Sequence, residues 1–226
     1  HDLLTGLPNR VLFKQRLCDA IEKAESRKTM LAVAFIDLDS FKAINDTMGH
    51  EAGDILLQKI AKVISGYLGE KDILSRFGGD EFVLLLAEPV REEDVLKTVH
   101  TILRAIQQPV ILRGQEFYVT ASIGISLYPR DGKDAKTLMK NADIAMYEAK
   151  DLGRNQCMFC SQPLKEKTEK NAQLSNSLYW ALEKKQLSVH YQPQIGLESG
   201  EIVGLEALLR WNLPSHGLIS PAIFIP

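Results

Sequence analysis

Two adjacent carboxylates, Asp80 and Glu81, follow a pair of glycines in the segment Arg76–Phe82, and the apolar run Val83–Leu86 comes next. This pattern predicts a strand, a tight turn and a second strand, with acids displayed at the turn. Paired glycines permit positive φ and let a ligand approach the backbone closely. Carboxylates beside such a turn are suited to a hard cation. The alternative is an ordinary surface hairpin, because glycine pairs followed by acids are common.

A second pair of acids ends the nearly continuous apolar run Met30–Asp39. Such a run is typical of a fully buried central strand. If this strand neighbours the glycine turn, Asp37 joins Asp80 and Glu81 in an oxygen-rich site suited to Mg²⁺ or Mn²⁺. The alternative is that Asp37 and Asp39 only end the strand and cap the next helix.

The remaining pattern alternates helices with strands and hairpins, which predicts an α+β sheet with helices packed on it. A helix after Asp39 would bring Lys42 and Asn45 back over the same edge of the sheet. Further helices are predicted at 8–27, 53–68, 92–107 and 134–152, the last one ended by Gly153. Strands are predicted at 109–112 and 117–127, as an antiparallel pair across residues 113–114, and at 156–159.

Five ordered segments resemble the GGDEF family of diguanylate cyclases: Asp2–Arg10, the strand that ends at Asp37, Asn45–Asp54, Gly78–Phe82 and Tyr147–Lys150. Together they are far more specific than any one of them alone, and the resemblance covers residues 1–160. It implies a ferredoxin-like core related to nucleotidyl cyclases and polymerase palms, with a central, mostly antiparallel sheet flanked by helices.

The resemblance also implies an activity, the condensation of two GTP molecules into cyclic di-GMP with release of pyrophosphate. The 3′-hydroxyl of each GTP attacks the α-phosphorus of the other, which needs a metal ion and in-line geometry. Each active site would hold one GTP, so turnover requires a two-fold homodimer.

By resemblance, the metal ligands are Asp37, the Leu38 carbonyl, Asp80 and Glu81. Asp80 also matches the proton acceptor, a role that fits awkwardly with a metal-bound carboxylate. Lys42 matches the group that stabilises the developing phosphate charge. Its alternative is a solvated helix lysine.

The nucleotide contacts implied by the resemblance are Asn45 and Asp54 for guanine, Lys150 and Arg154 for the terminal phosphates, and the turn glycines Gly78 and Gly79. Asp can accept hydrogen bonds from guanine hydrogens that adenine lacks. The alternative for Asp54 is N-capping of a helix that starts after Gly53. Lys150 and Arg154 are four residues apart at a helix end, which predicts one shared face. Their alternative is a solvated charged face.

One departure concerns product inhibition. Many diguanylate cyclases carry an RxxD inhibitory site before the glycine turn, and the corresponding stretch here is Gly69–Asp72. Asp72 is present, but Gly69 stands where the arginine would grip the product. We therefore expect no tight product inhibition through this site.

The rest of the chain predicts a polar connecting helix at 163–185, with Leu174, Leu178 and Leu182 on a narrow face, and strands at 187–195 and 202–211. These strands resemble the opening of an EAL phosphodiesterase domain, with Glu206 and Arg210 at motif positions. The match covers about 40 residues, whereas a TIM-type barrel needs about 250. We expect a GGDEF domain at 1–161, a connecting helix at 162–185 and an incomplete EAL barrel at 186–226, inactive on cyclic di-GMP.

Composition is that of an ordinary globular chain, with 45% hydrophobic and 25% charged residues and a net charge of −2. It gives no indication of binding a nucleic acid polymer. Cys157 and Cys160 have CxxC spacing but no second ligand pair, which favours reduced thiols in a strand. No signal peptide or membrane-spanning run is present, so we expect a cytoplasmic location. The chain starts at His1 without Met, and we expect a fragment whose parent carries an upstream sensor, with a membrane anchor left open.

Two functions of different kinds remain after this comparison. The first is an active diguanylate cyclase, because every matched catalytic position is filled. The second is a GTP-binding regulatory module that controls the phosphodiesterase activity of a downstream EAL domain. A third, a scaffold that binds no nucleotide, would be expected to lack Asp37 and an intact glycine turn.

Overall fold

The computed structural model describes residues 1–89, 91–215 and 217–225. The chain divides into two compact units, His1–Lys165 and Glu166–Pro226. No helix in the described part of the chain is both long enough and apolar enough to cross a bilayer.

The first unit is built on a five-stranded sheet in the order β2-β3-β1-β6-β7. The strands are β1 (Leu31–Leu38), β2 (Ile73–Gly78), β3 (Glu81–Leu86), β6 (Ala121–Tyr128) and β7 (Cys157–Phe159). Strand β1 pairs antiparallel with both β3 and β6, while β7 is parallel to β6. All of β1 is buried, which confirms the apolar run as the central strand.

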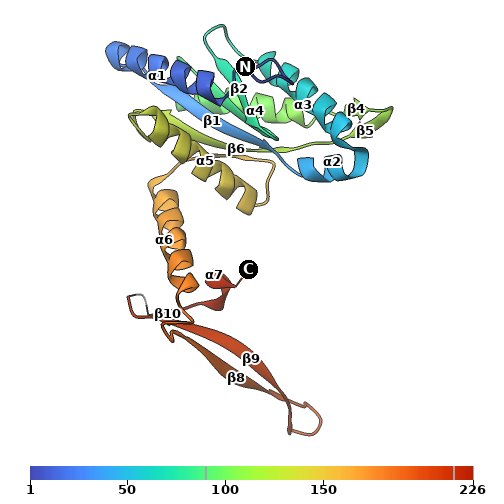
Figure 1. The fold of residues 1–226 in the computed structure, drawn as a ribbon, viewed down its shortest axis with the longest axis vertical. Helices are drawn as coiled ribbons and strands as arrows, with labels where there is room; N and C mark the ends of the chain where they lie inside the picture. The colour runs from blue at the N-terminus through green and yellow to red at the C-terminus, as the bar shows by residue number, and fades with distance from the viewer. Residues whose placement is uncertain (90, 216, 226) are drawn as a thin grey trace. The chain divides into compact units, whose positions relative to one another are not determined.

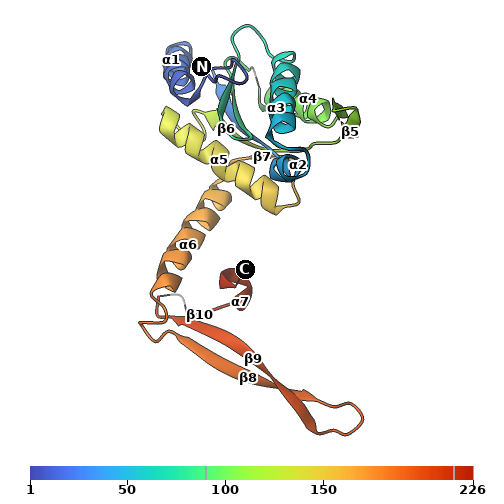
Figure 2. The ribbon, with the colours of Figure 1, turned by 45° about the vertical axis from the view of Figure 1, so that its right-hand side comes forward.

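Helices cover both faces of this sheet (Figure 1, Figure 2). Helices α1 (Arg10–Arg27) and α5 (Ala135–Asp151) share a core with Val33 and Phe35. Helices α3 (His50–Ser65) and α4 (Glu92–Ile106) share a core with Ala34 and Ile36. Successive side chains of a strand point to opposite faces. This alternation assigns Asp37 to the face covered by α1 and α5, and the layered arrangement confirms the predicted α+β fold.

Two predicted elements differ from the structure. The hairpin across residues 113–114 joins β4 (Val110–Leu112) to a short β5 (Gln115–Phe117), and β6 is a separate strand of the main sheet. The predicted pairing with 117–127 was therefore right at the turn and wrong in extent. Helix α3 begins at His50 rather than after residue 52. Gly49, with φ of 84°, ends the short helix α2 (Phe41–Met48) and starts α3.

The second unit contains a three-stranded antiparallel sheet in the order β10-β9-β8. Its elements are β8 (Leu187–Ile195), β9 (Ile202–Leu213), β10 (Gly217–Ile219) and the short helix α7 (Pro221–Phe224). Trp211 is fully buried in its core beside Leu174, whereas Trp180 is 47% exposed. The residues described here form no closed barrel.

Helix α6 (Gln162–Tyr179) ends before the predicted limit at residue 185. Leu182 lies beyond its end and is 77% exposed, so it does not continue the apolar stripe of Leu174 and Leu178. Within the first unit, the start of α6 is anchored by Leu164, which packs with Ala145 and Cys160.

Candidate active site

The glycine turn joins β2 to β3 and lies beside the end of the central strand. Gly78 and Gly79 have φ of 145° and 52°, both in the region that favours glycine. A register shift between Arg76 and Gly78 marks a bulge. The Leu38 amide donates to the carbonyl oxygen of Asp80 at 3.4 Å, so the turn and the end of β1 are direct neighbours.

Asp37 and Glu81 are cross-strand partners in the register of β1 with β3. Paired residues of an antiparallel ladder lie on the same face. On that face, Lys150 of α5 places its Nζ 2.7 Å from Oδ2 of Asp37, and both side chains are largely buried. The carboxylates of the strand and the turn therefore meet the cationic end of α5 at one corner of the sheet.

These carboxylates disfavour each other's ionised forms. Burial, together with the charges of Asp80 and Asp39, raises the pKa of Asp37 despite its bond to Lys150. Burial and the charges of Asp37, Asp143 and Asp80 raise the pKa of Glu81. Asp37 is buried, whereas Asp80 is half-buried and Glu81 is exposed at the rim. A cluster of like charges favours binding of a cation, because the cation restores the ionised forms.

The donor set fits a hard divalent ion in its chemistry, since it offers carboxylate oxygens and backbone carbonyls. Within the described ranges, however, no three His, Cys, Asp or Glu side chains are gathered closely enough to hold an ion. The ammonium of Lys150 is the cation that contacts Asp37 in this structure.

Asn45 and the start of α3 form the second part of the site. A Cβ on Gly53 would lie only 1.9 Å from Oδ1 of Asn45, so this amide packs directly against the residue before Asp54. That Oδ1 is buried and has no hydrogen-bond partner among the described residues. Asp54 is exposed inside α3 and does not cap it, because the N-cap is Gly49. Lys42 is exposed on α2, three residues before Asn45 and on the same side.

Lys150 and Arg154 do not share a helix face, contrary to the prediction. Helix α5 ends at Asp151, and Gly153 and Arg154 follow with φ of 113° and 63°. Lys150 points into the acidic corner, while Arg154 is exposed beyond the helix end.

Sequence reasoning assigned no role to Asp2 and Arg76, which together support the turn. The Arg76 guanidinium donates from Nη1 to both carboxylate oxygens of Asp2, and from Nε and Nη2 to the Gly79 carbonyl at 3.0 and 2.7 Å. Burial alone would raise the pKa of Asp2, but hydrogen bonds from Thr5 and Arg76 lower it. We call this arrangement the Arg76 bridge. The sequence signal that could have indicated it is Asp2, which opens the matched segment Asp2–Arg10.

The alternative that Asp39 caps the next helix is wrong, because Asp39 does not cap α2. Ser40 is the N-cap of α2 and makes no capping bond with its side chain. The buried Asp39 carboxylate instead accepts from the Thr120 and Ser122 hydroxyls and from the Asn155 amide. Asp143 is a further residue that the sequence did not single out, and its charge acts on Glu81. Its spacing of seven residues from Lys150, two helical turns, could have indicated a shared face.

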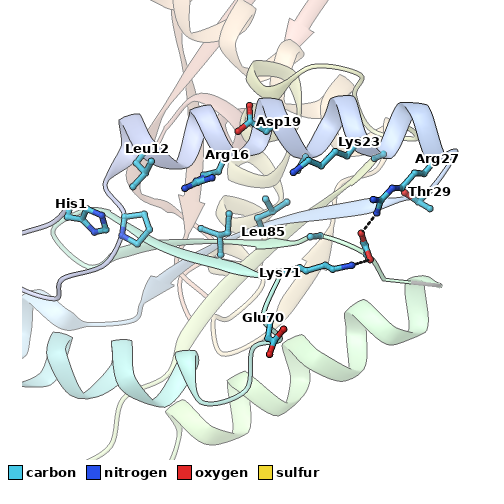
Figure 3. A pocket seen from close by; sticks show the side chains of 16 residues that line it. His1, Leu12, Arg16, Asp19, Lys23, Arg27, Thr29, Glu70, Lys71 and Leu85 are labelled. Atoms are coloured by element: carbon cyan, nitrogen blue, oxygen red, sulfur yellow. Dashed lines mark hydrogen bonds and ion pairs between the residues drawn. The ribbon is translucent and has the colours of Figure 1, made fainter.

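A cavity of about 560 Å³ lies apart from this corner, between α1 and the β2–β3 hairpin (Figure 3). None of the predicted site residues lines it. Arg27 and Lys71 both form ion pairs with Glu88 at its rim. Next to it, Asp72 accepts from the backbone amides of Gly69 and Ala87, so both of its oxygens serve the local fold.

Family models match both parts of the chain. The model described as "Diguanylate cyclase, GGDEF domain" matches residues 1–156. The chain belongs to the GGDEF family. A model of the EAL domain matches residues 175–226. In that segment, Glu206 is exposed opposite Gln192 on β8, and Arg210 donates to the Leu209 carbonyl.

The GGDEF chain is 45% identical, over its whole length, to the bifunctional diguanylate cyclase/cyclic di-GMP phosphodiesterase MucR of Pseudomonas aeruginosa, covering 33% of that protein. It is 40% identical to the cyclic di-GMP phosphodiesterase NbdA of the same organism, covering 29% of it. The chain thus spans about a third of the length of these relatives.

Solved GGDEF domains have the same fold as the first unit. The GGDEF domain of YfiN from Pseudomonas aeruginosa is 42% identical, with a TM-score of 0.68 over 70% of this chain and 98% of that chain. The GGDEF domain of DgcB from Caulobacter crescentus, solved with cyclic di-GMP, is 29% identical, with a TM-score of 0.67 over 71% of this chain and 93% of that chain.

Proposed function

We propose that the first unit is a diguanylate cyclase that condenses two GTP molecules into cyclic di-GMP and pyrophosphate. The observation that carries the proposal is the cross-strand pair of Asp37 and Glu81 beside the two-glycine turn. Burial and mutual repulsion raise the pKa of both carboxylates, as expected for acids arranged around a cation.

Each part of the site has a task in this reaction. Asn45 and Asp54 bind the guanine edge, and the buried Oδ1 of Asn45 is an acceptor left for a ligand. Lys42 stabilises charge on the reacting phosphate, and Lys150 and Arg154 bind the terminal phosphates. The carboxylate of Asp80 accepts the proton of the attacking 3′-hydroxyl.

Mg²⁺ or Mn²⁺ would be held by Asp37, the Leu38 carbonyl, Asp80 and Glu81, and would neutralise phosphate charge when bound. Since one site holds one GTP, two copies of the chain face each other as a homodimer during turnover.

The test is incubation of concentrated protein with GTP and MgCl₂, with chromatographic detection of cyclic di-GMP. We expect product from the natural chain and none from Asp80→Ala. Asp134→Asn is the matched control, because it removes an exposed acid at the far end of α5 and should leave product formation unchanged. Absence of product from a dimer enforced by a fused coiled coil would contradict the proposal.

A second candidate is a GTP-binding regulatory module for a downstream phosphodiesterase. It is supported by the EAL match to residues 175–226 and by relatives named as phosphodiesterases, such as NbdA. GTP binding without product, together with GTP-stimulated hydrolysis of cyclic di-GMP by the longer parent protein, would favour this candidate.

A further inference from the structure

The segment after α5 has an unusual backbone. Gly153, Arg154 and Asn155 are consecutive residues with φ of 113°, 63° and 50°. A helix end commonly uses one left-handed residue, and glycine takes it without strain. Left-handed backbone costs roughly 1–2 kcal/mol for a residue such as arginine, whereas asparagine adopts it more readily. Arg154 therefore keeps its left-handed backbone because surrounding contacts hold it, and one of them is the bond from its own amide to the Ala149 carbonyl at 3.0 Å.

Asp39 makes the contact that reaches this segment from the central strand. Its carboxylate is 6% exposed, and Oδ2 accepts the Asn155 amide at 3.1 Å. Thr120 and Ser122 donate to the same carboxylate at 2.7 and 2.8 Å and fix its orientation. On the other side, Gln107, the C-cap residue of α4, donates to Oδ1 of Asn155 at 2.6 Å. The residue after Arg154 is thus held from two elements.

The neighbouring acid of the same strand end holds the same segment at a second point. Asp37 bonds to Lys150 at 2.7 Å, five residues before Asn155. The carboxylates at 37 and 39 therefore hold both ends of 150–155, and Arg154 lies between the two contacts. Its own guanidinium is exposed and makes no hydrogen bond or ion pair with the residues that the structure describes.

We propose that Asp39 is a positioning residue for phosphate recognition, which holds Arg154 where it can bind the terminal phosphates of GTP. This inference rests on the proposed function, because it takes Arg154 as a phosphate ligand. Asp39 is buried and acts only through the backbone of Asn155, without touching the nucleotide.

The test compares binding of GTP and GMP by the full chain, because GMP lacks the terminal phosphates. In Asp39→Ala we expect the dissociation constant for GTP to rise about tenfold or more, as for loss of a charge-assisted hydrogen bond, while that for GMP stays within about twofold. Arg154→Ala should give the same change, and the double variant should add nothing further.

Two variants separate positioning from general destabilisation. Asp39→Asn should restore binding, because the carboxamide oxygen still accepts the Asn155 amide and the hydroxyls can reverse their roles. Asp134→Ala removes the N-cap bond at the other end of α5. It should lower stability without changing the ratio of GTP to GMP affinity.

Hydrogen exchange of the Asn155 amide provides a readout that needs no nucleotide. We expect fast exchange at Asn155 in Asp39→Ala, with the amides of α5 still protected. If the Asn155 backbone amide stays protected in Asp39→Ala, the hydrogen bond from Asn155 to Asp39 does not hold this segment. Lost protection with unchanged GTP preference would overturn the positioning role. If the natural chain does not distinguish GTP from GMP, the proposed function fails together with that role, and the exchange result still decides whether Asp39 orders the segment.

Discussion

Gly53 and Asn45 constrain each other at the scale of single side chains. The absence of a Cβ at residue 53 creates the space that the Asn45 amide fills. The position of Asn45 therefore requires glycine at residue 53. Helix propensity opposes this choice, because glycine inside a helix costs about 1 kcal/mol relative to alanine. A glycine retained inside α3 at this cost is explained by the position of Asn45.

Gly53→Ala should displace Asn45 and weaken GTP binding. The added Cβ would meet Oδ1 of Asn45 at 1.9 Å and Cζ of Phe41 at 3.1 Å. Overpacking of this kind destabilises by about 1–3 kcal/mol. Chemical denaturation and GTP titration would measure both effects.

Gly66→Ala is the matched control at the end of the same helix. Gly66 has φ of −67°, and its added Cβ would have no neighbour closer than 3.4 Å. We expect it to keep GTP affinity and to gain about 0.4–1 kcal/mol of stability. Equal behaviour of the two variants would contradict the role assigned to Gly53.

Glu81→Gln should stabilise the protein at neutral pH while abolishing product formation. Burial and neighbouring acids raise the pKa of Glu81 in the folded state. Such a group contributes fully to stability below its unfolded pKa, and that contribution is lost as pH rises through the folded pKa. Glutamine does not ionise, so the variant does not lose this stability as the pH rises. The melting temperature of Glu81→Gln should therefore exceed that of the natural chain at pH 7, and the difference should vanish near pH 4.

Glu88→Gln should show the opposite sign. A hydrogen bond from Lys71 lowers the pKa of Glu88, so its contribution is present at neutral pH and is lost as pH falls. We expect a lower melting temperature at pH 7 for this variant. A stabilising effect of Glu88→Gln would contradict a lowered pKa of Glu88. A destabilising effect of Glu81→Gln would contradict a raised pKa of Glu81.

At the scale of elements, the Arg76 bridge joins the N-terminal turn to the β2–β3 hairpin. The side chains of Arg76 and Asp2 are only 11% and 19% exposed. One planar guanidinium satisfies both a carboxylate and the Gly79 carbonyl, a geometry that an ammonium cannot reproduce.

Arg76→Lys should therefore lower stability by about 1–3 kcal/mol and reduce cyclic di-GMP formation, because the turn before Asp80 loses its support. Arg113→Lys is the comparison, since the pair of Arg113 with Glu51 is exposed at 54% and 86%. Substitution there should change stability by less than about 0.5 kcal/mol. Similar losses in both variants would argue against a special role for the bridge.

We expect the segment before β2, residues 69–72, to determine whether cyclic di-GMP inhibits the protein. Gly69 has no side chain to grip cyclic di-GMP, and both Asp72 oxygens bind backbone amides. We expect the natural chain to keep its initial rate in micromolar cyclic di-GMP, measured by pyrophosphate release. Tight binding of product that is lost in Asp72→Ala would contradict this expectation.

The main elements could be predicted because their patterns are local. The apolar run of β1 and the glycine turn can each be recognised from a few consecutive residues. The antiparallel register of β1 with β3 then places Asp37 opposite Glu81. The end of α5 could not be predicted in full. Glycine at 153 indicated the stop, but the contact that holds Asn155 comes from the distant Asp39, which lies 116 positions away in the chain. Likewise, the start of α3 depends on the backbone of Gly49 rather than on a side-chain cap.

At the scale of the whole molecule, the first unit carries its own two-sided core and should fold alone. A fragment of residues 1–170 retains Leu164, which is 7% exposed beside Ala145 and Cys160. A fragment of residues 1–161 lacks it. We expect the shorter fragment to be less stable by roughly 2 kcal/mol or more, in line with loss of a buried leucine side chain.

Thermal unfolding followed by circular dichroism would compare the two fragments. The longer one should also be less prone to aggregate than the full chain, because strands β8 and β9 expose Val189, Tyr191, Val203 and Leu205. Equal stability of both fragments would place the end of the folded GGDEF domain at residue 161, the boundary predicted from the sequence.

Both tryptophans of the chain, Trp180 and Trp211, belong to the second unit. Intrinsic tryptophan fluorescence therefore originates only from Glu166–Pro226, and the unit that carries the acidic corner has no tryptophan emission of its own. Emission of the intact chain thus provides a label confined to the second unit, without chemical modification. A change in that emission when GTP is added would report directly that nucleotide binding in one unit is felt in the other.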